Sequence, residues 1–234
     1  MKNVLCFIVT YFLTITALPS ASPMFTTLSF QTEKVLPSKI IAITYVTHTL
    51  QNNTEVFHGY YTYPKFTETF SSASTLNQYY FQQFIQDYQE MKEIRDTASL
   101  NILPPKTSYA YDHTFEITTI SEKMISIIEN ITTYAGGIQP TSFRKSNTFH
   151  LESGKKVSLE DLLSPVSHDV DNLVRSYLIA EINKSPNDYY PDATQIVQKK
   201  SLNTFLFYLT PTEFVIYFNP GEIAPYLKGV VEFR

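Results

Sequence analysis

The sequence predicts an α+β fold, in which antiparallel sheets pack against helices. Apolar side chains alternate with a period of two along several stretches of the first half, as in strands with one buried face. A helix-period apolar stripe interrupts these strands, and the second half combines helix-capping signals with two further strand-like runs. Because 43% of the residues are apolar, the chain can bury a substantial core.

The chain begins with the pattern of a secretory signal peptide, which we place at residues 1–22. Lys2 precedes an apolar run from Val4 to Leu18, and small residues follow at Ser20, Ala21 and Ser22. An uncleaved anchor is the alternative, but the apolar run is short for a membrane span. We therefore expect an exported protein, either periplasmic, at the cell surface or secreted, with no transmembrane anchor in the mature chain. The single cysteine, Cys6, lies in the leader, so the mature chain would form no disulfide.

After an N-terminal extension at 23–37, residues 38–137 predict a hairpin, a helix and a second hairpin. Ser38–Leu50 and Val56–Tyr63 alternate around the polar turn at 51–54, and Tyr109–Ile120 alternates most regularly of all. Between them, the apolar residues of the helix recur every three or four positions up to about Arg95: Leu76, Tyr80, Phe84, Tyr88 and Met91. We expect a four-stranded antiparallel sheet with one helix across it.

The stretch Lys123–Leu163 joins the two halves of the chain. A strand over Lys123–Tyr134 runs into Ala135 and then into two adjacent glycines, Gly136 and Gly137. Glycine allows a positive φ or a close backbone approach that other residues resist. We therefore expect an irregular segment with an unusual backbone at these two positions.

Residues 138–234 predict short helices and a C-terminal hairpin. Ser142–Leu151 is strand-like, and Ser158 with Asp161 matches a capping box. A second helix begins at Ser167, with an apolar stripe formed by Val170, Leu173, Val174, Tyr177 and Leu178. Residues 187–200 predict a loop with one short helix. The strands 203–209 and 213–218 form a hairpin, and 229–233 form a last strand.

The residues themselves point to no catalytic, metal or cofactor site. The five histidines show no metal-ligand spacing, and the sequence contains no nucleophile elbow or phosphate-binding loop. The acidic pairs at 160–161 and 169–171 lie at helix N-termini, where negative charge is favourable. A net charge of −4 without a basic block argues against nucleic acid as a partner. We predict a protein that is not an enzyme and needs no cofactor.

Two motifs resemble a known family. Tyr134–Gly137, then Phe149, Gly154-Lys155 and Leu159–Leu163, resemble the pattern Y-x-G-G-A-H followed by a polar strand and T-G-K-x-L-x-L-x-D-L-F. Phe218–Tyr226 resembles F-x-P-Y-E-I-A-P-Y. Both patterns belong to the extracytoplasmic domain family of the anti-sigma-V factor RsiV, which also occurs beside the catalytic domain of the peptidoglycan deacetylase PdaC. It is a family of domains of unknown function.

The resemblance extends to most of the mature chain. Tyr63-Pro64 precedes a helix with Asn77 near its start, as in the N-terminal part of that family. It therefore implies an RsiV-like domain of two parts, and it implies lysozyme as a partner, because the anti-sigma factor's domain recognises lysozyme. Two departures stand out: Ile138-Gln139 replaces the usual Ala-His, and Gly221 replaces a tyrosine. Neither the anti-sigma segment nor the deacetylase domain of the relatives has a counterpart here.

We expect the ligand-binding residues on two irregular segments that follow strong strands. Binding residues collect on loops carried by a rigid scaffold, and proline lowers the ordering cost of binding. The expected residues are Tyr134, Gly136, Gly137, Gln139, Pro220, Glu222, Pro225 and Tyr226. We expect the two segments to lie close together. The alternative is that both are turns that only maintain the fold, with Ile223 and Tyr226 in the core.

Three functions remain open at this point. The first is a secreted, non-catalytic binding domain at the bacterial cell envelope, with a lysozyme-like protein or a peptidoglycan or other wall glycan as ligand. The second is an enzyme that modifies peptidoglycan or another polysaccharide, suggested by the deacetylase association. The third is a structural envelope domain. An enzyme needs a cleft with convergent titratable groups of perturbed pKa, whereas a binding domain needs an exposed surface rich in tyrosine and proline.

Overall fold

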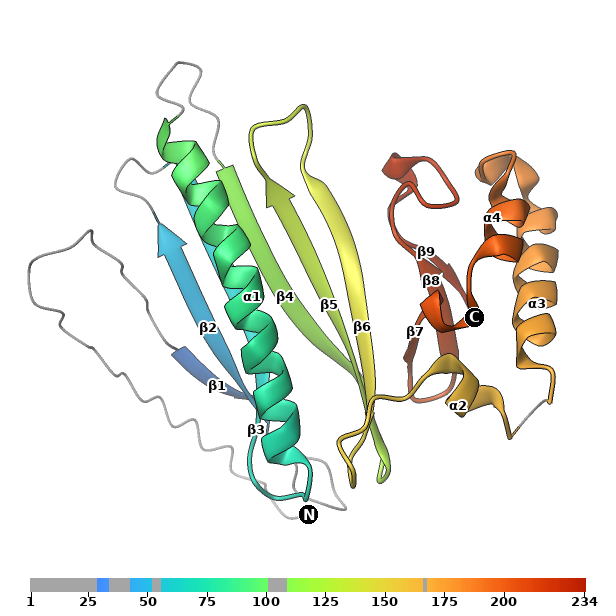
Figure 1. The fold of residues 1–234 in the computed structure, drawn as a ribbon, viewed down its shortest axis with the longest axis horizontal. Coiled ribbons are helices and arrows are strands. Elements are labelled where there is room, and N and C mark those ends of the chain that lie inside the picture. The colour runs from blue at the N-terminus through green and yellow to red at the C-terminus, as the bar shows by residue number, and fades with distance from the viewer. Residues whose placement is uncertain (1–28, 34–42, 52–55, 101–108, 166–167) are drawn as a thin grey trace, which may run out of the picture. The chain divides into compact units, whose positions relative to one another are not determined.

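The computed structural model describes residues 29–33, 43–51, 56–100, 109–165 and 168–234, and its fold class is α+β, as predicted. The predicted leader at 1–22, most of the extension at 23–37, the turn at 52–54 and the loop at 101–106 lie outside the described residues. In the first part of the described chain one α-helix lies between the third and fourth of six strands, and three α-helices precede the last three strands (Figure 1).

Six strands form one sheet in the order β1-β2-β3-β4-β5-β6 (Figure 1). Five of them match predicted strands to within a few residues. The sixth, β1, lies in the predicted extension and pairs antiparallel with β2. The strands are β1 (Ser29–Glu33), β2 (Ile43–Gln51), β3 (Phe57–Phe66), β4 (Tyr109–Ile120), β5 (Met124–Tyr134) and β6 (Thr141–His150).

The expectation that the sheet of the first half is antiparallel throughout is wrong at one pair. β3 and β4 pair in parallel, with Phe57 opposite Tyr109 and Tyr61 opposite His113. The helix α1 (Ala73–Leu100) connects them. A strand that returns parallel to its predecessor needs a long crossover, usually a helix, and α1 supplies it. The β2–β3 hairpin is antiparallel, as predicted.

Two compact units divide the chain. The first contains the described residues up to Phe115 together with Ile131–Thr141, and the second contains Glu116–Asn130 and Ser142–Arg234. The strands β4 and β5 therefore contribute residues to both units. The division that the sequence predicts between residues 137 and 138 stays a prediction.

In the first unit, α1 lies across the strands β2 and β3 (Figure 1). The predicted apolar stripe provides its buried face, including Leu76, Tyr80 and Met91. A Cβ added to Gly59 on β3 would lie 2.5 Å from Cε of Met91, so the small residue permits this close packing. Near the start of α1, the side-chain amide of Asn77 accepts a hydrogen bond from N–H of Phe66 and donates one to its carbonyl, at 2.7 and 2.8 Å.

The second unit packs three helices against a three-stranded antiparallel sheet of order β7-β8-β9 (Figure 1). The helices are α2 (Leu159–Leu163), α3 (Val170–Lys184) and α4 (Ala193–Lys199), and the strands are β7 (Leu206–Leu209), β8 (Phe214–Phe218) and β9 (Val231–Phe233). Short 3-10 helices occur at Pro186–Asp188, Leu202–Thr204 and Tyr226–Lys228. The predicted hairpin and last strand are confirmed.

The helix starts follow from their caps. Ser158 and Asp161 form the predicted capping box reciprocally: each side chain accepts a hydrogen bond from the other's backbone N–H. The start predicted at Ser167 is wrong, because Asp169 is the N-cap of α3 and accepts from N–H of Asn172. Leu173, expected in the buried stripe, is 43% exposed, and Ile182 is buried instead.

Candidate functional site

The predicted glycine segment belongs to the first unit and is braced by two tyrosines. Gly136 has a φ of 84°, and a Cβ at this position would lie 2.5 Å from the hydroxyl oxygen of Tyr109. The hydroxyl of Tyr134 donates to the carbonyl of Gly137 at 2.8 Å, and its ring lies 6.2 Å from that of Tyr109. Gly136 is thus required for both its backbone and its close contact, as predicted. Gly137 has neither requirement.

The tip of this segment is exposed. Ile138 is fully exposed, and the side chain of Gln139 and Pro140 are exposed as well. A single exposed apolar side chain is ordinary on protein surfaces and does not by itself mark a site. Tyr134 and Gly136 therefore hold the segment, whereas Ile138 and Gln139 are free to contact a ligand.

The second predicted segment, Phe218–Tyr226, belongs to the second unit, where most of its side chains support the fold. One carboxylate oxygen of Glu222 accepts from N–H of Asn219 at 3.1 Å, and the other pairs with Lys200 at 3.2 Å. Ile223 and Ala224 are buried in the core of this unit. Gly221 has a φ of 83°, a conformation that glycine adopts without strain and a tyrosine would not.

Two side chains of this segment close the edge of β6. The amide oxygen of Asn219 accepts from N–H of Arg144 at 2.6 Å, while its amide nitrogen donates to the carbonyl of Arg144 at 3.1 Å. The hydroxyl of Tyr226 accepts from N–H of Ser142 at 2.6 Å. These side chains take the place of a neighbouring strand, as Asn77 does for Phe66 in the first unit. The alternative that places Ile223 and Tyr226 in the core is correct for Ile223, whereas Tyr226 contacts the edge of β6.

The sequence prediction of the site is thus divided between the two units. Tyr134, Gly136, Gly137 and Gln139 lie in the first, and Pro220, Glu222, Pro225 and Tyr226 in the second. Pro225 is exposed and Pro220 is partly buried. That the two groups face one ligand together stays a prediction.

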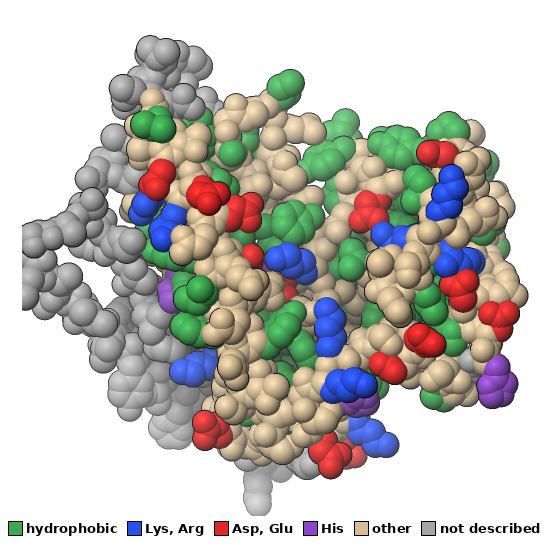
Figure 2. All heavy atoms as spheres, viewed as in Figure 1, with side chains coloured by type: hydrophobic (Ala, Val, Ile, Leu, Met, Phe, Trp, Pro, Cys, Tyr) green, Lys and Arg blue, Asp and Glu red, His purple; other side chains and the backbone are tan. Residues whose placement is uncertain are grey.

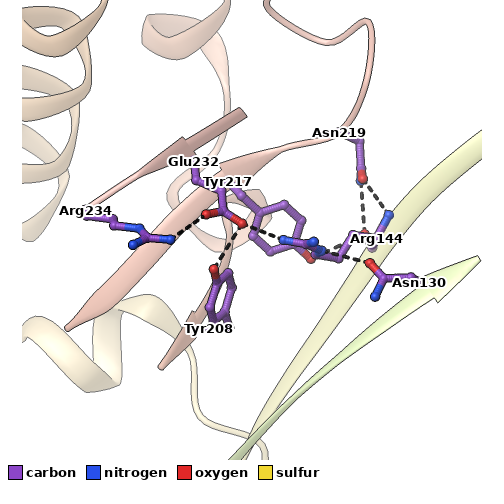
Figure 3. A network of polar contacts seen from close by, with 7 residues as sticks. All are labelled: Asn130, Arg144, Tyr208, Tyr217, Asn219, Glu232 and Arg234. Carbon is purple, nitrogen blue, oxygen red and sulfur yellow. Dashed lines mark hydrogen bonds and ion pairs between the residues drawn. The ribbon is translucent and has the colours of Figure 1, made fainter. Parts of the chain in front are cut away.

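A polar network that the sequence analysis missed surrounds Arg144 in the second unit (Figure 3). Its guanidinium donates through Nε to Asn130 at 3.0 Å and through Nη1 to Glu232 at 2.7 Å. We call the side chains of this network the Arg144 cluster. They come from β5, β6, β7, β8, β9 and the residue after β9: Asn130, Arg144, Tyr208, Tyr217, Glu232 and Arg234.

The rest of the cluster converges on Glu232 and on the ring faces of two tyrosines. Tyr208 donates its hydroxyl to Glu232 at 3.0 Å, and Arg234 pairs with the other carboxylate oxygen at 3.1 Å. The Arg144 guanidinium lies 5.9 Å from the Tyr208 ring centre and 5.7 Å from that of Tyr217, within cation–π range. Its side chain is 17% exposed and that of Glu232 26%, so solvent reaches the cluster.

The pKa values of three titratable groups in the cluster are shifted further from pH 7. Burial favours the protonated form of Glu232, but hydrogen bonds from Arg144, Arg234 and Tyr208 outweigh it, and its pKa lies below the usual value. Burial, followed by the bond to Glu232, raises the pKa of Tyr208. Burial also raises the pKa of Tyr217. Glu232 is therefore ionised and both phenols are protonated across the neutral pH range.

A second polar group lies in the interior of the same unit. Glu129 and Ser126 of β5 are fully buried, and Glu129 accepts from the amide of Asn147 at 2.7 Å. The hydroxyl of Ser126 accepts from N–H of Leu209 at 2.9 Å and lies 2.9 Å from the Thr148 hydroxyl. Burial lowers the pKa of Lys156, and Glu129 partly opposes that shift. These bonds link the strands of the unit by side chains.

In the described part of the chain, no three His, Cys, Asp or Glu side chains are grouped as metal ligands would be. None of the described helices has the length and apolar character needed to span a membrane.

Comparison with known proteins relates the chain to a family without an assigned function. Residues 160–234 match the model of the family described as protein of unknown function (DUF3298). No curated protein matches the chain. A solved structure of a DUF3298 member from Bacteroides fragilis is 16% identical, covers 91% of each chain and superposes with a TM-score of 0.56. A family protein from Pseudomonas aeruginosa is 13% identical, covers 92% of this chain and 90% of its own, and has a TM-score of 0.53.

At these identities the two structures establish a shared fold and nothing further. The family match lies within the predicted C-terminal part and ends with the β8–β9 segment that contains the second motif. The chain is therefore similar to DUF3298 proteins in its fold and in its C-terminal sequence.

Proposed function

We propose that this protein is an exported, non-catalytic binding domain of the bacterial cell envelope, with a lysozyme-like protein or a wall glycan as its ligand. Export rests on the leader pattern at 1–22. The ligand classes rest on the resemblance of the two motifs to the extracytoplasmic domains of RsiV and PdaC. The similarity to DUF3298 proteins agrees with such a domain without naming a ligand.

The observation that carries the proposal is the geometry of the Arg144 cluster, in which Arg144 bonds Asn130 and Glu232 while Arg234 pairs with the same carboxylate. The directions of the pKa shifts in the cluster agree with a binding role. A general acid or base works best with a pKa near the operating pH. The pKa of Glu232 moves down and those of Tyr208 and Tyr217 move up, so each group moves away from that condition. Charges and dipoles held in one state suit recognition, which needs fixed donors and acceptors.

Two surface features favour a folded ligand or a glycan over nucleic acid. Acidic and basic side chains are mixed over the face in Figure 2, whereas nucleic acid selects a continuous basic surface. Ile138 in the first unit and Leu227 in the second are almost wholly exposed. Each lies on an irregular segment carried by a rigid scaffold, where binding residues of proteins collect.

The test is capture by the immobilised chain, with lysozymes of several classes and purified wall fragments offered in separate arms. We expect one arm to give saturable, reversible binding. Ile138→Ser and Gln139→Ala should weaken that binding, because both side chains are exposed and neither supports the fold. Leu173→Ser is the matched control, since it removes an exposed apolar side chain from α3. No binding in either arm would overturn the proposal, and so would a chemically altered wall fragment.

A further inference from the structure

We propose that the Arg144 cluster is a binding site for the carboxylate of an acidic sugar. The inference names the ligand chemistry of the binding domain proposed above and therefore rests on that function. The residues concerned are Arg144, Asn130, Tyr208, Glu232 and Arg234, all in the second unit (Figure 3).

The cluster leaves two hydrogen-bond donors without a partner in the described residues. Nε and Nη1 of Arg144 have the partners described above, but Nη2 has no partner within the described residues. The same holds for the amide nitrogen of Asn130, whose oxygen accepts from Arg144. Nη2 lies between the two engaged nitrogens on the planar guanidinium. A carboxylate oxygen there would receive a charge-assisted hydrogen bond, which is stronger than a neutral one.

The cluster also has an excess of positive charge. Arg144 and Arg234 both contact Glu232, so two cations share one carboxylate. Glu232 is ionised, as its lowered pKa requires. The three side chains together have one positive charge in excess, in a chain whose net charge is −4. One bound carboxylate would balance that excess, whereas a cation would meet two arginines.

Both the backbone and the side chain of Arg144 are held in place. The backbone of Arg144 is fixed by Asn219, whose amide bonds both its N–H and its carbonyl. The guanidinium is fixed by Asn130 and Glu232 and lies over the rings of Tyr208 and Tyr217. An arginine already held in one orientation loses little entropy when a ligand binds.

The hydroxyls of a sugar fit two other groups of the cluster, the amide of Asn130 and the ionised carboxylate of Glu232. Hydroxyl groups both donate and accept hydrogen bonds. The free amide nitrogen of Asn130 offers a donor, and the carboxylate of Glu232 offers an acceptor. A carboxylate on a ring with hydroxyls therefore matches the cluster better than a bare anion, which would use only Arg144 and Arg234.

The experiment is an NMR titration of the ¹⁵N-labelled chain with glucuronate, with glucose as the neutral sugar and acetate as the bare carboxylate. We expect glucuronate to shift the signals of Arg144 and Asn130 saturably, acetate to bind more weakly, and glucose not to bind. Arg144→Gln should weaken glucuronate binding about tenfold or more, because it removes a charge-assisted bond. Arg95→Gln is the control, since Arg95 pairs with Asp96 on α1 in the other unit.

A second variant covers the case in which Arg144→Gln does not fold. Asn130→Asp keeps the acceptor for Arg144 but adds a negative charge, so the fold should remain while glucuronate affinity falls about tenfold. Equal binding of glucuronate by the wild type and both variants would overturn the inference, and so would equal binding of glucose. If wall fragments or lysozyme bind while glucuronate does not, the inference fails and the proposed function stands. If none of these ligands binds, both the inference and the proposed function are overturned.

Discussion

Gly136 and Gly137 are neighbours in the sequence, yet the structure requires glycine at only one of them. Gly136 has a positive φ and lies against the ring of Tyr109, whereas a Cβ on Gly137 would come no closer than 3.8 Å to its nearest neighbour, the carbonyl oxygen of Gln139. The sequence predicted an irregular backbone for the pair, because two glycines permit it. It could not tell which residue needs it, since the contact comes from Tyr109, more than twenty residues earlier.

Gly136→Ala should destabilise the fold by about 1–3 kcal/mol, the cost of forcing a non-glycine residue into a strained backbone region. The clash with Tyr109 adds to that cost. Gly137→Ala should change stability by less than about 1 kcal/mol, because its φ is not positive. Urea unfolding of both variants measures the difference. Equal losses for the two would contradict this account of the segment.

His48 gives the protein a pH-dependent stability. Its ring stacks 4.0 Å from Phe84, and its Nε2 is buried without a hydrogen bond in the described residues. Burial lowers its pKa from 6.5 to about 4. The unfolded chain therefore takes up a proton at a higher pH than the folded chain does, and the contribution of His48 to stability is lost as pH falls from about 6.5 towards 4.

Replacing the ring by an apolar one should remove that dependence. Unfolding free energies of the wild type and His48→Phe are to be compared at several pH values between about 4 and 7. We expect the wild type to lose more stability on acidification than the variant. A variant with the same acid sensitivity would show that other groups determine it.

At the level of the elements, apolar periodicity predicted the strands and helices well. Strand β4 follows from period-two alternation, α1 from its stripe, and the β7–β8 hairpin from two strand-like runs on either side of a turn. The direction of the β3–β4 pair was missed, because alternation identifies strands and not their partners. The Arg144 cluster was missed for a related reason: Arg144 and Glu232 are 88 residues apart, so no local spacing marks them. The one signal of the cluster in the sequence was a charged residue within each of two predicted strands, Arg144 in 142–151 and Glu232 in 229–233.

Asn219 tests the view that the C-terminal motif serves the edge of β6. Asn219→Ala should cost about 1–3 kcal/mol, because it leaves N–H of Arg144 without its acceptor. Asn187→Ala removes an exposed asparagine outside any such clamp and should stay within about 0.5 kcal/mol of the wild type. Chemical denaturation decides. If Asn219→Ala is as stable as the wild type, Asn219 does not support the fold and becomes a candidate residue of the binding surface.

For the whole molecule, the two units share strands and are interleaved along the chain. Ile131–Thr141 of the first unit is inserted between two segments of the second. Neither unit is therefore one continuous piece of chain. We expect a single cooperative unfolding transition by far-UV circular dichroism, tyrosine fluorescence and calorimetry. Two separate transitions would mean that the units fold independently.

We propose that the protein binds an envelope ligand and does not transform it. The most direct measurement incubates wall fragments with the immobilised chain at several pH values from about pH 6 to pH 8.5. At each pH, the retention of the fragments on the chain and their mass are recorded together. Because the titratable groups of the Arg144 cluster remain in one state over that range, the account predicts nearly constant affinity and fragments of unchanged mass. Time-dependent loss of acetyl groups or shortening of the glycan, with a bell-shaped pH profile, would contradict it.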